Sequence, residues 1–125
     1  MANVAAVRVP TVYDDDIRLW YWSFTDADTA LPVVVAGFPD VTVNVVSKSA
    51  SCTVNFTGTL VPIDQNGLAT PVYHILEDPG AVALTFTTTA VGIDTVKQAC
   101  YAVKPTMTAG TATAVVYVMA SRSRR

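Results

Sequence analysis

The sequence predicts an all-β chain: a single antiparallel β-sandwich or barrel, jelly-roll-like, with little or no helix. Three observations predict this fold class. Valine and threonine, whose β-branched side chains suit a pleated and half-buried surface, dominate a composition that is 51% hydrophobic and only 14% charged. Apolar and polar residues alternate with period two along most of the chain, and helical periodicity is scarce. About eight or nine such short runs, separated by turn residues, are typical of sandwiches and barrels.

The first predicted strand is rich in aromatic residues. It is expected over 17–24, where period two places three aromatic side chains on one face: Trp20, Trp22 and Phe24. A polar turn follows over 25–29. The returning strand is expected over 31–36, which ends at a break containing glycine and proline.

The middle of the chain alternates as clearly, and it is expected to form these strands: 41–46, 52–60, 72–76 and 82–88. Asn66-Gly67, a strong turn dipeptide, lies in the loop before the strand at 72–76. Asp78-Pro79-Gly80 forms the next predicted turn, because proline and glycine stand at positions that suit one.

The last third of the chain holds the one weak helix candidate, residues 91–98. Gly92 and its β-branched neighbours disfavour more than one helical turn there. The strand at 101–104 is expected to stop at Pro105, which cannot donate to a sheet ladder. After another turn, the final strand is expected over 114–120.

The chain of 125 residues is expected to be one domain with two short appendages. Residues 1–14 are predicted to form an extended arm, 15–121 the β-sandwich and 122–125 a basic tail. The net charge is −2, and the three arginines of the tail leave residues 1–121 at −5. A nucleic-acid-binding surface would show a broad basic stripe, so no nucleic-acid partner is expected.

No membrane span and no secretory signal are expected. The longest apolar runs, such as 31–36, are less than half of the roughly 20 residues that a spanning helix needs. The first residues lack a basic start followed by a continuous apolar stretch, so the chain is expected to stay in the cytoplasm where it is made. Cys52 and Cys100 are therefore expected to be reduced and buried, and a disulfide would require neighbouring strands.

The residue inventory predicts that the chain is not an enzyme. His74 is the only histidine, no Gly-x-Ser-x-Gly elbow is present, and neither cysteine stands in a reactive sequence context. Strand phase places His74 on a solvent or interface face. Glu77 and Asp78 are adjacent, so on a strand they would face opposite sides, and Asp78 is better explained as the first residue of a turn.

No metal or cofactor is expected either. The carboxylates at 14–16, Asp26 and Asp28 could supply a calcium site only if the fold brought them together, and their spacing does not match an EF-hand loop. They are interpreted as solvated turn and edge residues. A chain with one histidine and no Cys-x-x-Cys pair has little from which to build a zinc site, and no glycine-rich phosphate loop is present.

The apolar content indicates a covered surface. Mean hydropathy is +0.40, and a domain this small buries only about two-thirds of its unfolded surface, so apolar side chains must remain outside a monomer. The candidate contact residues lie in the arm, the aromatic face and the tail: Val4, Val7, Val9, Val12, Trp20, Trp22, Phe24, Arg122, Arg124 and Arg125. The aromatic face is interpreted as mainly core with a share in an interface, and the arm as a segment that adds to a neighbour's sheet.

Five features follow one another from Ile17 onward: the tryptophan hairpin 20–35, the strand 41–45 after a Pro-Asp break, the run 76–86, the segment 101–105, and Gly110-Thr111 before a valine-rich strand that ends on arginines. Their order resembles a family of short virion structural proteins from tailed bacteriophages. The run 76–86 resembles the family's L-x-D-P-x-G-x-x-L-x-F, with the glycine one place early. Lys104 stands where the family usually has arginine, and the segment 58–62 replaces a Gly-Ser-Asn-Asp-Gly-type turn.

This resemblance implies a non-enzymatic virion component, above all a capsid decoration, or cement, protein that binds the head exterior and stabilises it by bridging coat subunits. The implied partners are the major capsid protein and further copies of the chain, as trimers. The implied location is the capsid surface, after synthesis in the cytoplasm of a bacterial host. Two alternatives stay open: a neck, tail or baseplate module, and a carbohydrate- or receptor-binding β-sandwich.

Overall fold

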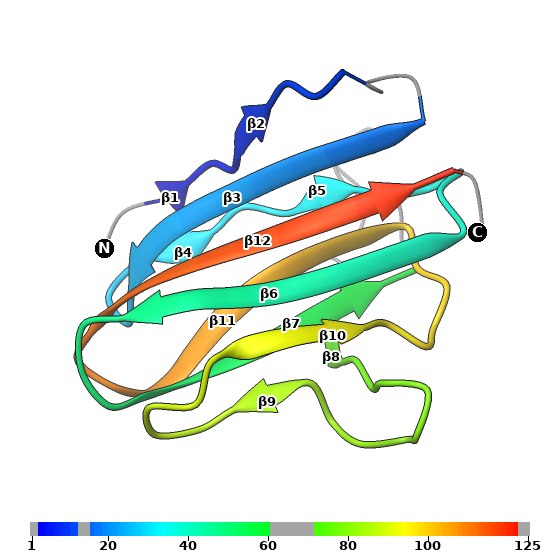
Figure 1. The fold of residues 1–125 in the computed structure, drawn as a ribbon. Helices are drawn as coiled ribbons and strands as arrows, with labels where there is room; N and C mark the ends of the chain where they lie inside the picture. Colours follow the sequence, from blue (N-terminus) through cyan, green and yellow to red (C-terminus); the bar gives the residue numbers. More distant parts are fainter. Residues whose placement is uncertain (1–2, 13–15, 61–71, 123–125) are drawn as a thin grey trace.

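The computed structural model describes residues 3–12, 16–60 and 72–122, and these residues form strands and no helix. Two five-stranded antiparallel sheets face each other as a β-sandwich, which confirms the predicted all-β fold class (Figure 1). The described part of the chain has no helix long and apolar enough to cross a membrane. The predicted Asn66-Gly67 turn lies outside the described residues.

The front sheet of Figure 1 has the strand order β10-β6-β12-β3-β2. In that order, the strands span Gly92–Thr95, Asp40–Lys48, Thr113–Ser121, Ile17–Thr25 and Val7–Val9. The last strand of the chain, β12, is thus inserted between two earlier ones. Its ladder with β3 runs without a break from Thr113 opposite Thr25 to Ser121 opposite Ile17.

The back sheet has the order β5-β11-β7-β8, with β9 also paired to β7. In that order, these strands span Val33–Val34, Ala102–Gly110, Cys52–Thr59, His74–Ile75 and Thr85–Phe86. Because β8 and β9 pair with different parts of β7, they share one edge of that strand. A separate parallel ladder joins β1 (Asn3–Val4) to β4 (Thr29–Ala30).

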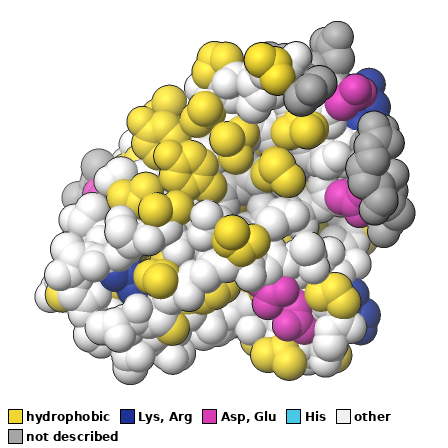
Figure 2. Space-filling model, in the orientation of Figure 1, with side chains coloured by type: hydrophobic (Ala, Val, Ile, Leu, Met, Phe, Trp, Pro, Cys, Tyr) yellow, Lys and Arg dark blue, Asp and Glu magenta, His cyan; other side chains and the backbone are white. Residues whose placement is uncertain are grey.

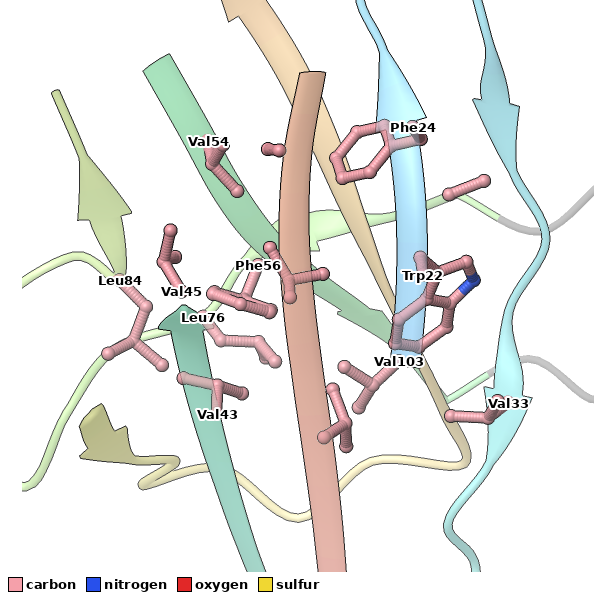
Figure 3. Packing of buried hydrophobic residues seen from close by; sticks show 14 of the residues in the cluster. Trp22, Phe24, Val33, Val43, Val45, Val54, Phe56, Leu76, Leu84 and Val103 are labelled. Atoms are coloured by element: carbon pink, nitrogen blue, oxygen red, sulfur yellow. The ribbon is translucent and has the colours of Figure 1, made fainter. Parts of the chain in front are cut away.

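The core fills the space between the two sheets. Trp22 and Phe24 of β3 point inward, as period two requires, Val43 of β6 does so on the far side of β12, and Phe56 of β7 faces them from the back sheet (Figure 3). None of these side chains is more than 2% exposed. The indole nitrogen of Trp22 donates to the Leu31 carbonyl at 2.9 Å, so the polar atom of the largest core residue is paired.

Two predicted element boundaries are wrong. The weak helix candidate 91–98 contains strand β10, because pairing with β6 supplies backbone partners that an isolated turn would lack. Strand β11 does not stop at Pro105 but continues to Gly110. At Pro105 the described strands place β7 on one side only, since β5 pairs just with Ala102 and Val103, and a proline is tolerated where one side has no ladder.

The predicted arm is part of the domain. Strand β2 extends the front sheet by pairing with β3, and the Val4 carbonyl accepts a hydrogen bond from the Leu31 amide at 2.8 Å. Val4 also packs against the core. The arm therefore covers the edge of strand β3 in its own sheet, and the expectation that it can add to a neighbour's sheet stays a prediction. Residues 13–15 lie outside the described residues.

Candidate protein interface

The front sheet has an outer face, opposite to the core, that is apolar. Residues directly opposite one another in a ladder share a face of the sheet. The registers align one row of side chains across all five strands: Val7, Tyr21, Tyr117, Asn44 and Ile93. A second row lies beside it: Val9, Leu19, Met119, Thr42 and Thr95.

We call these two rows, together with Ser23, Val46 and Val115 on the same side, the front outer face. None of the side chains in these rows is charged, and Asp40 of β6, opposite Ser121, lies on the same side of the sheet in the next row. In Figure 2, hydrophobic side chains gather over β3 and β12, and acidic side chains lie in the lower half of the view and at its right margin. Ile93 is 70% exposed, Val7 48% and Val46 46%, so large apolar groups face solvent at both sides of the sheet.

A shallow groove of about 430 Å³ crosses the front outer face. It is lined by Leu19, Thr42, Asn44, Val46, Ile93, Tyr117 and Met119. Beside it, the rings of Tyr21 and Tyr117 stack at a centroid distance of 5.4 Å and an interplanar angle of 31°. The short side chains of Thr42 and Asn44 thus form a low strip on β6, and the side chains on β12 and β3 are larger. Another protein surface can fit against this uneven face.

The back sheet has a polar cluster beside exposed apolar residues. Asn55 Nδ2 donates to Thr108 Oγ1 at 3.1 Å, and Thr85 Oγ1 donates to Asn55 Oδ1 at 2.8 Å. The Lys104 ammonium lies 4.5 Å from the centroid of the Tyr73 ring, and burial raises the pKa of that tyrosine. These groups satisfy one another within the domain, whereas Leu60, Val72 and Ile75 nearby are 74%, 64% and 49% exposed.

The predicted aromatic contact face divides between two environments. Trp22 and Phe24 are buried and cannot touch a partner while the sandwich is folded. The prediction that these two residues contribute to an interface is therefore wrong. Trp20 is partly buried against the core, and the Arg8 guanidinium lies 5.9 Å from its ring centroid. The face that does look outward is the other side of the same strand, with Leu19 and Tyr21.

The predicted arm and tail residues are also spread out. Val7 and Val9 lie on the front outer face, whereas Val4 packs against the core and Val12 is 90% exposed. Arg122 is bound to its own domain. Its backbone amide donates to the Asp16 carbonyl at 2.7 Å, and its guanidinium lies 5.2 Å from the Phe38 ring centroid. Arg124 and Arg125 lie outside the described residues.

The sequence analysis missed Tyr117, Met119 and Ile93 as surface residues. In the last strand, Ala114, Val116, Val118 and Ala120 alternate with Val115, Tyr117 and Met119, so the alternation showed which residues share a face. A sheet whose smaller residues face the core leaves its larger ones outside. Which set faced the core was not readable from the alternation, because both sets are apolar.

The residues with potential chemistry lie in a groove and in turns. His74 is exposed on β8 and lines a second groove that also contains Cys100. Burial raises the pKa of the Cys100 thiol, which opposes the thiolate that a nucleophile needs. Asp28 Oδ2 accepts from the Thr25 amide at 2.9 Å, and Asp78 Oδ1 accepts from the Gly80 amide at 2.9 Å.

The predicted turn at 78–80 is confirmed, because the Ala81 amide donates to the Asp78 carbonyl at 2.9 Å. Asp14 and Asp15 lie outside the described residues. Among the described residues, no group of three or more His, Cys, Asp or Glu side chains is placed to hold a metal ion. Asp28 and Asp78 stabilise turns, whereas Glu77 Oε1 accepts a hydrogen bond from Gln98 Nε2 at 3.1 Å.

Cys52 and Cys100 are free thiols at opposite ends of β7. Cys52 is buried opposite Gly110, and Cys100 is only partly buried, against Gly58. Six residues of strand separate Cys52 from Gly58, which is about 20 Å, so the two sulfurs are far beyond disulfide reach.

Comparison of the chain with protein-family models, with curated proteins and with solved structures gives no match. The front outer face is the candidate site on its geometry alone. It is wide, uncharged and partly exposed, and it is built on the rigid central strands of a sheet.

Proposed function

We propose that this protein is a structural component of a bacteriophage virion, a decoration protein that binds the head exterior and reinforces the shell by bridging coat subunits. The observation that carries the proposal is the front outer face, an apolar sheet surface without charge on a domain of 125 residues. Covering apolar surface gains roughly 25 cal/mol per Å², and large exposed patches of this kind mark contacts between proteins. An assembly component is covered in this way throughout its working life.

We also propose a finer fold assignment, a jelly roll. We count β8 and β9 as one interrupted strand, leave out β4 and letter the remaining strands from β3 to β12 in chain order as B to I. The front sheet then has the order B-I-D-G and the back sheet the order C-H-E-F. Eight strands in two such sheets are typical of jelly rolls, a fold that viral capsid domains share with lectins and cupins. The strand order supports the virion proposal only together with the exposed face, because a fold alone does not imply a function.

The mechanism follows from mass action. A protein that binds only the assembled shell stabilises it by about 2.7 kcal/mol per site when its concentration is 100 times Kd. A symmetric shell repeats the site many times, so modest contacts add up to a large effect. The partners in this proposal are the major capsid protein and further copies of the chain.

The test uses heads assembled without this protein. We expect purified protein to sediment with them, to cover the head surface in many copies and to raise the temperature at which they break. A few copies confined to one vertex would instead place it in the neck, tail or baseplate. Binding of the isolated protein to a glycan array, with none to heads, would favour the carbohydrate-binding alternative. Failure to bind heads or tails at all would overturn the proposal.

A further inference from the structure

We propose that the front outer face is a contact between two copies of this chain, which pack their front sheets face to face about a two-fold axis. The inference goes beyond the proposed function, because it names the occupant of the face, and it can be tested without heads. It rests on the charge, the size and the relief of the face.

Charge favours a second copy over other occupants. Residues 1–121 carry a net charge of −5, so two copies repel each other over most of their surfaces. The two rows of the front outer face have no charged side chain and Asp40 lies beyond them, so two copies that meet on these rows bring no like charges into direct contact. A different partner would normally be selected by complementary charges, and this face has none to offer.

The size of the face fits a small specific dimer. The strands β2, β3, β12, β6 and β10 have 3, 9, 9, 9 and 4 residues, and at about 4.8 Å by 3.3 Å for each residue the whole outer side of the sheet measures roughly 540 Å². Two copies therefore cover on the order of 1,000 Å² between them before the relief of the side chains is counted, and specific interfaces begin at about that area. Sheets pack face to face about 10 Å apart in sandwiches, so the geometry is an ordinary one.

The relief of the face is self-complementary. The low strip on β6, at Thr42 and Asn44, lies to one side of β12, and the large side chains of Leu19 and Tyr21 on β3 lie to the other. A two-fold axis in the plane of contact, along the central strand β12, sets β3 of each copy over β6 of its partner, so the large side chains of β3 lie over the low strip. Since each copy uses the same patch, the contact closes at two copies. This pairing differs from the trimer that the family resemblance implies.

The experiment measures the mass of the full chain in reducing buffer by sedimentation equilibrium. We expect twice the chain mass of 13.3 kDa. The variant Ile93→Lys is expected to weaken the dimer at least about 30-fold, as loss of an interface hot spot does. The fold should survive, because Ile93 is 70% exposed on an edge strand. Val82→Lys is the matched control: Val82 is 62% exposed but lies in the turn region before β9, and this variant should stay dimeric.

Three outcomes would overturn the inference. The first is a wild-type chain that is still monomeric at about 100 µM, because its association would then be weaker than that of most specific interfaces. The others are a trimer, or a dimer that Ile93→Lys leaves intact. Tyr117→Arg, at the centre of the face, provides a second test, and its thermal unfolding is recorded beside its mass to show that it folds. High salt screens charge–charge contacts, so association that weakens steeply with salt would also contradict an uncharged interface. Loss of the dimer with head binding retained would separate this inference from the proposed function.

Discussion

At the scale of single residues, two glycines share a backbone conformation but differ in their surroundings. Gly37 has φ +88° and Gly110 has φ +92°, values that side-chain-bearing residues rarely adopt. A Cβ at Gly37 would have nothing within 4 Å, whereas one at Gly110 would clash with the Ser51 carbonyl oxygen and lie 2.7 Å from Cys52 Cα. Gly110 ends β11 just before the chain crosses to the front sheet, so the crossing depends on this close approach.

These two positions form a matched pair of variants. Gly110→Ala is expected to lower the free energy of unfolding by about 2–4 kcal/mol, because backbone strain and steric overlap add. Gly37→Ala carries the strain alone and is expected to cost about 1 kcal/mol. Urea unfolding of both variants measures the difference. Equal losses would show that the contact with Ser51 and Cys52 does not matter.

Ala81 has a backbone conformation that suits glycine better than alanine. Its φ is +62°, and it stands at the position where the resembled family has glycine. Ala81→Gly is expected to raise stability by about 0.5 kcal/mol, since relief of left-handed strain exceeds the greater freedom of glycine in the unfolded chain. Ala83→Gly, two residues away with no positive φ, should be destabilising. Thermal unfolding of both variants tests the difference in sign.

Cys100 gives stability a dependence on pH. Burial raises the pKa of its thiol above the ordinary 9.0. The unfolded chain therefore releases this proton first, so the contribution of the protonated thiol is complete below pH 9 and is lost as pH rises through the folded pKa. We expect the stability difference between the wild type and Cys100→Ala to narrow above pH 9 in urea unfolding. A difference that is constant from pH 7 to 10 would contradict this.

At the scale of elements, one lysine ties the two sheets together. Lys48, at the end of β6 in the front sheet, donates from Nζ to three carbonyls on the back-sheet side: Cys52 at 2.8 Å, Phe86 at 2.7 Å and Thr88 at 3.1 Å. Burial lowers the pKa of Lys48, and nearby Cys52 partly offsets this effect. The carbonyls come from β7, β9 and the segment after β9, so a single ammonium joins four parts of the chain.

Removing this ammonium should loosen one end of the sandwich. Lys48→Met keeps the length of the side chain but leaves three acceptors without this donor, and we expect a loss of about 1–3 kcal/mol. Lys97→Met is the control, because Lys97 is exposed, and it should change stability by less than about 0.5 kcal/mol. Hydrogen exchange should locate the loss at the Cys52 amide, which donates to the Thr88 carbonyl. If Lys48→Met and Lys97→Met have the same free energy of unfolding, the hydrogen bonds of the Lys48 ammonium do not contribute to stability.

At the scale of the whole molecule, the fold joins the two ends of the chain. In the long ladder of β12 with β3, Ser121 lies opposite Ile17, and β12 pairs with β6 on its other side. The centre of the front sheet therefore cannot form until the C-terminal strand arrives. Forming contacts between residues this far apart in sequence first requires closing a long loop. Loop closure costs conformational entropy before the contacts stabilise the fold.

This topology predicts slow folding. Refolding from urea should have a relaxation time in the range of milliseconds to seconds, as for other proteins dominated by non-local strand pairing. Stopped-flow Trp fluorescence reports it, because Trp22 is buried in the core. Complete refolding within microseconds would show that local contacts dominate instead.

The amino-acid sequence by itself determined the all-β class and the pairs of residues that share a strand face. Period two placed Trp20, Trp22 and Phe24 on one side of 17–24 and Leu19 and Tyr21 on the other, and the structure has the same division. This was predictable because pleat and β-propensity act between near neighbours. The turn at Asp78-Pro79-Gly80 was predictable for the same reason.

Tertiary structure alone decided which of those faces is buried, and thereby where the candidate interface lies. Both faces of β3 carry large apolar residues, so the choice depended on the back sheet, whose Phe56 faces Trp22 and Phe24 across the core. Pro105 was accommodated because β5 ends before it, and β10 became a strand because β6 lay beside it. Burial and strand pairing join residues far apart in the chain, and a local pattern carries no record of which distant segment will pair with it.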